Sequence, residues 1–93
     1  MANTRKIIER CRENNIVIVF QNYPQGFQTF NKYLRNLAEE YRIPFVDNYS
    51  IFSELIKKNS RQKYLIGDGH CTPEGYEIVA QNVYAVLVKE KLL

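Results

Sequence analysis

The stretch Ile16-Val17-Ile18-Val19-Phe20 decides the fold that this chain is expected to adopt. Its five consecutive apolar residues are mostly β-branched, and such a run predicts a β-strand. Because no polar residue alternates with the apolar ones, the strand is expected to be covered on both faces, as in a parallel sheet. Pro44–Asp47 predicts a second, shorter strand.

Segments of helical period surround these two strands. Helices are predicted over Asn3–Asn14, from Thr29 to about Arg42, over Tyr49–Lys58, and from Pro73 to near the end of the chain. The second helix is the clearest, with apolar residues at Phe30, Tyr33, Leu34, Leu37, Ala38 and Tyr41. The last helix is expected to face inward with Tyr76, Val79, Ala80, Val83 and Leu87.

This alternation of helices and strands predicts one small α/β domain over residues 1–93, with a parallel sheet of two clear strands and about four helices. Two parallel strands cannot by themselves cover both faces and both edges of an Ile-Val-Ile-Val-Phe strand. Exposed edges of this kind pair with other chains. The sequence therefore predicts either a piece of a larger sheet or a chain that associates with itself.

The composition is that of a folded, water-soluble domain. It is 45% hydrophobic and 25% charged, with a formal net charge of +3, and seven Tyr and five Phe argue against disorder. The densest basic group, Lys57 to Lys63, is interpreted as a solvated helix end and not as a nucleic-acid surface. The apolar runs are too short to span a membrane, and the absence of a signal-peptide core favours the cytoplasm.

The only histidine, His70, lies in a glycine-flanked loop just ahead of the last helix. Thr72 is a suitable N-cap for that helix, and Pro73 suits its first position. Asp68 stands two residues before His70, and a histidine with a carboxylate makes up two thirds of a hydrolytic triad. A loop histidine that only hydrogen-bonds the backbone is the alternative.

The two cysteines give no metal-ligand spacing and require no disulfide. Cys11 is expected to be a buried thiol on a helix face, whereas Cys71 is a weak candidate nucleophile beside His70. Asp47, at the expected carboxyl end of its strand, is either a helix cap or a site residue. A metal site of His70, Cys71, Asp68 and Asp47 lacks the usual zinc spacing, so no metal and no cofactor are predicted.

The segment Asp68-Gly69-His70-Cys71-Thr72-Pro73-Glu74-Gly75-Tyr76, followed by Ile78-Val79-Ala80, resembles the last conserved block of the SGNH (GDSL-type) hydrolases. In that family an Asp and a His precede a helix that begins Thr/Ser-Pro-x-Gly-Tyr/His.

The upstream chain is similar to the same family. The strand Ile16–Phe20 with Tyr23-Pro24 resembles its penultimate strand, and the Asn31–Glu40 helix with Ile43–Asp47 resembles the helix and strand that follow. The resemblance covers nearly the whole chain but only about the C-terminal half of such an enzyme.

The resemblance implies a partial flavodoxin-like three-layer α/β/α fold and the hydrolysis of an ester, with His70 as general base and Asp68 as its orienting acid. The family's Asp-x-x-His spacing would place the acid at position 67, which is Gly67 here. The nucleophile and oxyanion-hole blocks have no counterpart, since Ser50, Ser53 and Ser60 lie outside any such motif.

The chain is therefore predicted to be a fragment or domain of an ester hydrolase that is inactive alone. It would act on an ester only when a missing N-terminal segment completes it. The alternative is a non-catalytic α/β interaction module that dimerises through its sheet edge.

Overall fold

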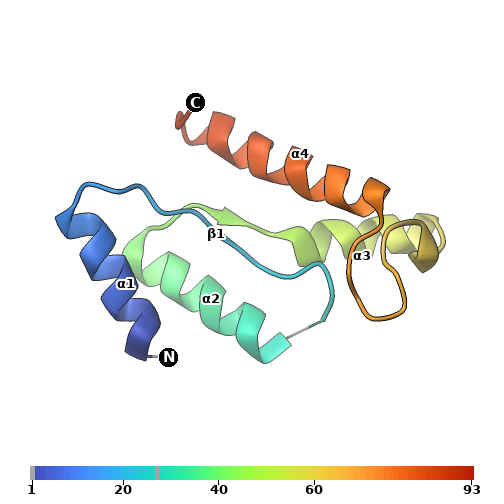
Figure 1. Cartoon of the computed structure of the whole chain (residues 1–93), viewed down its shortest axis with the longest axis horizontal. Helices are drawn as coiled ribbons and strands as arrows, with labels where there is room; N and C mark the ends of the chain where they lie inside the picture. Colours follow the sequence, from blue (N-terminus) through green and yellow to red (C-terminus); the bar gives the residue numbers. More distant parts are fainter. Residues whose placement is uncertain (1, 27) are drawn as a thin grey trace.

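The computed structural model describes residues 2–26 and 28–93. Its elements, in chain order, are α1 (Ala2–Glu13), β1 (Phe20–Gln21), α2 (Gln28–Tyr41), β2 (Phe45–Val46), α3 (Asn48–Lys58), a 3₁₀ turn (Arg61–Lys63) and α4 (Pro73–Lys89). Figure 1 shows their arrangement. The prediction of a mixed α/β chain with four α-helices and a two-stranded parallel sheet is confirmed for the described residues, and most of the chain is helical.

The two strands run parallel, with Phe20 opposite Phe45 and Gln21 opposite Val46. The backbone N–H of Phe20 donates to the Pro44 carbonyl at 2.9 Å, and that of Asn22 donates to the Val46 carbonyl at 3.2 Å. Helix α2 makes the crossover between them, as parallel pairing requires. In Figure 1, α4 lies on one side of the strand pair, and α1 and α2 lie on the other.

The expected strand over residues 16–20 is wrong in extent and in burial. Only Phe20 and Gln21 pair with β2, and residues 16–19 lead into the strand without a ladder. Ile16 and Val17 are 56% and 66% exposed, so the strand is not covered on both faces. The pairing is short because β2 is only two residues long, and no third strand lies on the other edge within residues 2–26 and 28–93.

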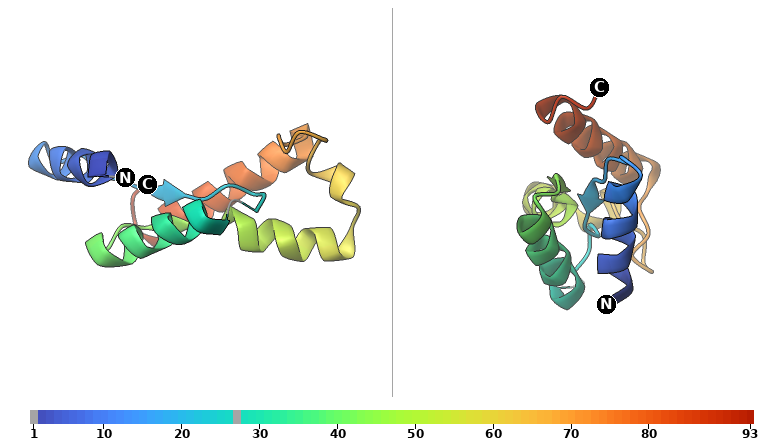
Figure 2. Two further views of the ribbon diagram at one scale, coloured as in Figure 1. Left: turned by 90° about the horizontal axis from the view of Figure 1, so that it is seen from below. Right: turned by 90° about the vertical axis from the view of Figure 1, so that its left-hand side faces the viewer.

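The buried apolar side chains form two small clusters along an elongated molecule. One cluster joins α1 to α2 through Ile8, Leu37, Ala38 and Ile43, and the other joins α3 to the segment before α4 through Phe52, Tyr64 and Leu65. Figure 2 shows α1 at one end of the long axis and α3 at the other. The radius of gyration is 14.4 Å, whereas a compact chain of this length has about 12 Å.

Polar contacts attach α1 to the end of α2. Arg5 forms an ion pair with Glu40, and the guanidinium groups of Arg5 and Arg12 lie 5.7 Å and 5.4 Å from the centroid of the Tyr41 ring. Cys11 is only half-buried, so the expectation of a buried thiol is wrong. This end of the molecule is therefore held by surface contacts and a small core.

The start of α4 follows the sequence prediction closely. The Thr72 hydroxyl accepts a hydrogen bond from the Gly75 N–H at 3.1 Å and donates to the Lys63 carbonyl at 2.7 Å. Pro73 occupies the first helical position. A Cβ at Gly75 would lie 2.2 Å from the Tyr64 carbonyl oxygen. Glycine is needed there because the helix passes against the preceding segment.

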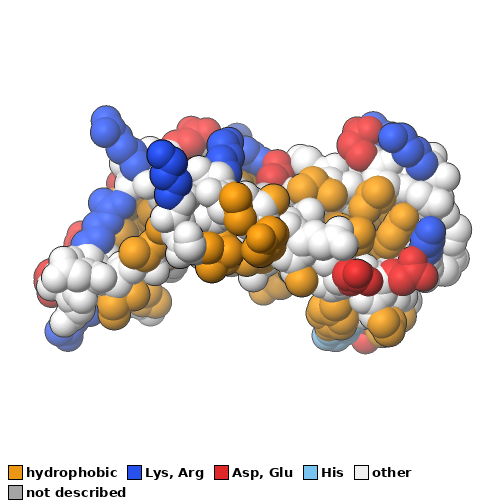
Figure 3. All heavy atoms as spheres, turned by 90° about the horizontal axis from the view of Figure 1, so that it is seen from above, with side chains coloured by type: hydrophobic (Ala, Val, Ile, Leu, Met, Phe, Trp, Pro, Cys, Tyr) orange, Lys and Arg blue, Asp and Glu red, His pale blue; other side chains and the backbone are white. Residues whose placement is uncertain are grey.

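The inward face predicted for α4 is partly wrong. Val79, Val83 and Leu87 are half-buried, but Tyr76 and Ala80 are exposed. Figure 3, which views the molecule from the α4 side, shows apolar side chains on the surface of that side. Among the described residues, no helix is both long and apolar enough to cross a membrane.

Candidate active site

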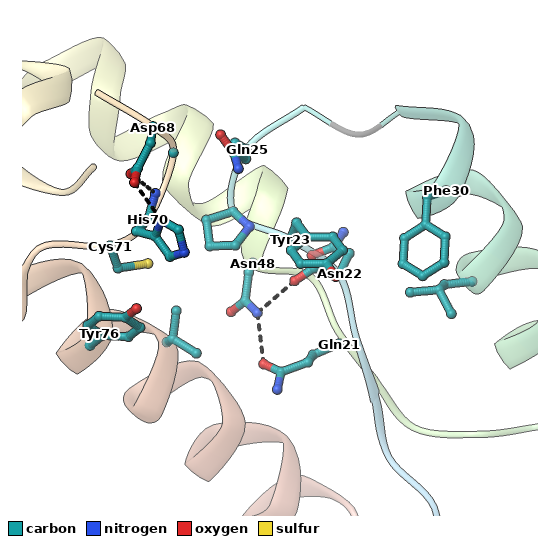
Figure 4. A pocket seen from close by; sticks show the side chains of 14 residues that line it. Gln21, Asn22, Tyr23, Gln25, Phe30, Asn48, Asp68, His70, Cys71 and Tyr76 are labelled. Atoms are coloured by element: carbon teal, nitrogen blue, oxygen red, sulfur yellow. Dashed lines mark hydrogen bonds and ion pairs between the residues drawn. The ribbon is translucent and has the colours of Figure 1, made fainter. Parts of the chain in front are cut away.

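A cleft of about 940 Å³ lies at the carboxyl end of β1. It is bounded by the loop after β1, by the start of α2, and by the loop that precedes α4 together with the first turns of α4 (Figure 4). Its lining includes the aromatic side chains Tyr23, Phe30 and Tyr76, with His70 at its border. Parallel α/β sheets place their ligand sites at this end of the strands.

The loop that carries His70 is a tight turn held by backbone hydrogen bonds. The Gly69 N–H donates to the Ile66 carbonyl at 2.9 Å, and the Ile66 N–H donates to the His70 carbonyl at 2.8 Å. Gly69 has a φ of +91°, a value that glycine adopts at little cost. A Cβ at this position would also overlap the side-chain amide of Gln25, so the histidine loop lies directly against the loop after β1.

Asp68 contacts His70 through both carboxylate oxygens. Its Oδ2 lies 2.9 Å from Nδ1 of the imidazole, and its Oδ1 accepts the His70 backbone N–H at 3.1 Å. These hydrogen bonds, the backbone one first, hold the pKa of the Asp68 carboxyl below its usual value. In Figure 4 the other ring nitrogen of His70 points away from Asp68, toward the cleft. The structure thus brings together the two residues that the sequence singled out.

The pair is open to solvent, with 70% of the His70 side chain and 62% of the Asp68 side chain exposed. Water screens an exposed ion pair, so such a contact orients the imidazole only weakly. A triad carboxylate acts from a buried position, where its charge is felt more strongly. Asp68 and His70 thus have the hydrogen bond of a catalytic acid–base pair, but they are not buried, and burial is what strengthens such a pair.

A network of amide side chains, which the sequence did not suggest, connects the wall of the cleft to α4. Asn48 is 1% exposed, and its Nδ2 donates to Gln21 Oε1 and to the Asn22 carbonyl, both at 3.0 Å. Asn82 of α4 donates from Nδ2 to Asn48 Oδ1 at 3.0 Å. Asn22 is itself buried at the end of β1. The sequence signal that could have indicated this network is that Asn22 and Asn48 lie just after the two strands.

Asp47 is a helix cap and does not support His70. Its carboxylate accepts the Ser50 N–H at 3.2 Å, Asn22 Nδ2 at 2.8 Å and Arg35 at 2.5 Å. Burial acts to raise the pKa of Asp47, but the hydrogen bonds from Asn22, Ser50 and Arg35 outweigh it and lower this pKa. All of these contacts hold α2, α3 and the end of β1 together, which is a structural role.

No serine or threonine is among the described residues that line the cleft. The Ser50 hydroxyl donates to Asp47 at 2.8 Å, and that of Ser60 donates to Gln62 at 2.9 Å. Cys71 does line the cleft, but burial raises the pKa of its thiol. A raised pKa keeps the sulfur protonated, which makes it a poor nucleophile.

In the part of the chain that the structure describes, no three His, Cys, Asp or Glu residues gather closely enough to hold a metal ion. The set of His70, Cys71, Asp68 and Asp47 is not brought together, because Asp47 is engaged by Arg35 and Asn22.

The chain matches no protein-family model, no curated protein sequence and no solved structure.

Proposed function

We propose that this chain carries the general base and the orienting acid of a serine ester hydrolase of the SGNH type. The observation that carries the proposal is the 2.9 Å contact between Asp68 Oδ2 and His70 Nδ1 at the border of the cleft. With Nδ1 engaged by a carboxylate, Nε2 remains to take a proton from a serine hydroxyl. The carboxylate would hold the imidazole tautomer and stabilise the imidazolium that forms.

The proposal includes a flavodoxin-like three-layer fold, of which this chain would form a part. It is supported by the parallel β1–α2–β2 unit and by the position of the cleft beyond the carboxyl ends of both strands. It is also supported by the sequence Thr72-Pro73-Glu74-Gly75-Tyr76, in which Thr72 caps α4 and Gly75 permits its close approach to Tyr64.

The nucleophile must come from outside these 93 residues, and so must the donors that stabilise the oxyanion. Losing one such donor lowers the rate by about 10²–10³, and losing the serine removes the acyl-transfer step. The isolated chain is therefore expected to be inactive on esters. The segment that supplies the serine would also cover the exposed Asp68–His70 pair and strengthen its electrostatic coupling.

Two observations test the proposal. The coding sequence upstream of Met1 should encode, in frame, a Gly-Asp-Ser segment, and the isolated chain should hydrolyse p-nitrophenyl acetate no faster than its His70→Ala variant. An in-frame stop codon with no such segment before it would contradict the first expectation. Turnover by the isolated chain that disappears in His70→Ala would contradict the second.

A non-catalytic α/β interaction module is the second candidate function. The exposed side chains of Ile16 and Val17, just before β1, and the unpaired edge of β1 within the described residues favour it.

A further inference from the structure

We propose that α1 and the free edge of β1 form a surface on which a second copy of this chain docks. The proposal goes beyond the acid–base role of His70 and concerns these 93 residues by themselves, since an upstream segment that paired with this edge would take the place of the second copy. We call this surface, made of residues 6–21, the edge surface. It lies on the opposite edge of β1 from β2 and includes the outer face of α1.

The edge of β1 has unpaired backbone groups. In a parallel ladder alternate N–H groups point to opposite edges. Those of Phe20 and Asn22 donate to the β2 side. Those of Val19 and Gln21 therefore point to the other edge, where the described chain has no strand.

This edge has neither charged residues nor proline to guard it against pairing. Proteins guard exposed edges with charged residues, proline or bulges. Residues 14–23 contain no charged residue and no proline, and Ile16 and Val17 are more than half exposed. An uncharged strand can lie antiparallel to its own copy without bringing like charges together.

The edge continues into a groove of about 550 Å³ along α1. Its apolar part consists of Ile7, Cys11 and Ile16, and Ile7 is 61% exposed. Its charged part consists of Lys6, Glu9, Arg10 and Glu13. None of these four side chains has an ion-pair partner in residues 2–26 and 28–93.

The order of these charges favours a second copy over an unrelated partner. In two antiparallel copies of α1 whose two-fold axis passes between Glu9 and Arg10, Lys6 comes opposite Glu13 of the other copy, and Glu9 comes opposite Arg10. Each pairing occurs twice about a two-fold axis and always joins opposite charges. Self-complementarity of this kind is what a two-fold interface requires.

The accessible surface is large enough to supply such an interface. It measures 6646 Å² for a mass of 11.0 kDa, whereas a folded monomer of that mass exposes about 5,600 Å². The excess of roughly 1,000 Å² belongs to the whole elongated chain, and it exceeds the about 800 Å² that each partner buries in a standard interface.

Sedimentation equilibrium of the whole chain tests the proposal. The expected species has twice the mass of 11.0 kDa, and Val17→Lys should convert it to a monomer because a charged edge resists pairing. Tyr84→Lys is the matched control, since Tyr84 is 62% exposed on α4, outside the edge surface. This control should leave the dimer intact. Ile7→Lys serves as a second disrupting variant if Val17→Lys does not fold, as judged by circular dichroism.

A charge exchange tests the antiparallel arrangement of α1. Lys6→Glu should raise the dimer Kd about tenfold, since two ion pairs become repulsive contacts. Lys6→Glu combined with Glu13→Lys should restore it. A monomer at every concentration, a dimer that Tyr84→Lys disrupts instead of Val17→Lys, open-ended assemblies, or a double variant no better than Lys6→Glu would each overturn the proposal.

Discussion

The carboxylate of Asp68 contacts His70 twice, with Oδ2 2.9 Å from the imidazole Nδ1 and Oδ1 accepting the backbone N–H at 3.1 Å. The second contact shapes the turn, as Asp side chains commonly do, and the first orients the ring. One residue thus has two roles that substitution can separate. Asparagine retains an acceptor for the backbone bond but lacks the carboxylate charge.

Asp68→Asn should therefore preserve the loop and change the imidazole tautomer. In the neutral imidazole of the wild type the ring proton should reside on Nδ1, facing Asp68 Oδ2. In Asp68→Asn the ring should shift toward the Nε2-protonated form. The ¹⁵N chemical shifts of the His70 ring report this directly. Asp68→Ala is the companion variant and should lose the turn as well, seen as faster amide exchange at His70. Identical ring shifts in wild type and Asp68→Asn would show that the carboxylate does not orient the ring.

Gly75→Ala should destabilise the chain, although alanine usually improves a helix. The added Cβ would lie 2.2 Å from the Tyr64 carbonyl oxygen, and overpacking of this kind costs about 1–3 kcal/mol. Gly67→Ala is the matched control, because a Cβ there has no neighbour within 4 Å and the backbone needs no positive φ. Urea unfolding should show a loss for the first variant and no loss for the second. Equal stabilities would refute the close approach of α4 to Tyr64.

Asp47 should make stability depend on pH in the acid range. Burial acts to raise its pKa, but hydrogen bonds from Asn22, Ser50 and Arg35 dominate and lower it. Its contribution is thus complete above the unfolded value of about 3.9 and is lost as the pH falls below that value through the folded pKa. Asp47→Asn should flatten this part of the free-energy profile measured by urea unfolding between pH 2.5 and 6. Asp47→Ala should also remove the N-cap of α3, at a cost of about 1 kcal/mol. If the free energy of unfolding of the wild type depended on pH no more strongly than that of Asp47→Asn, the role of the carboxylate would be contradicted.

Asn48→Ala should loosen the wall of the cleft. It removes the donor to Gln21 and Asn22 and the acceptor for Asn82, and a buried partner left unpaired costs about 1–3 kcal/mol. Asn36→Ala, on the exposed face of α2, is the control and should change stability by less than about 0.5 kcal/mol. Faster amide exchange in residues 21–26 should accompany the loss in the first variant. An unchanged free energy of unfolding in Asn48→Ala would mean that the amide network does not hold the cleft.

The features that the sequence predicted well depend on local chemistry. The apolar spacing of Leu34, Leu37 and Ala38 gives a buried helix face, and Thr72 with Pro73 marks the start of α4. These interactions join residues that are close in the sequence, so they form whatever the rest of the chain packs against them.

The features that it predicted poorly depend on partners distant in the chain. Burial of Ile16 and Val17 would require strands that the described residues do not provide. The amide network of Asn22, Asn48 and Asn82 joins three elements and has no period along the sequence. The pairing of Asp68 with His70, by contrast, was singled out from the sequence; its geometry depends on the turn at Gly69, whose φ of +91° cannot be read from spacing alone.

The most direct test of the proposed role of His70 is the effect of His70→Ala on esterase activity in the chain extended by its own upstream coding sequence. General acid–base catalysis contributes about 10²–10⁴ to such a rate. Hydrolysis of p-nitrophenyl acetate by the extended protein should fall by that factor in His70→Ala and by less in Asp68→Asn. An extended protein that hydrolyses the ester equally well without His70 would contradict it.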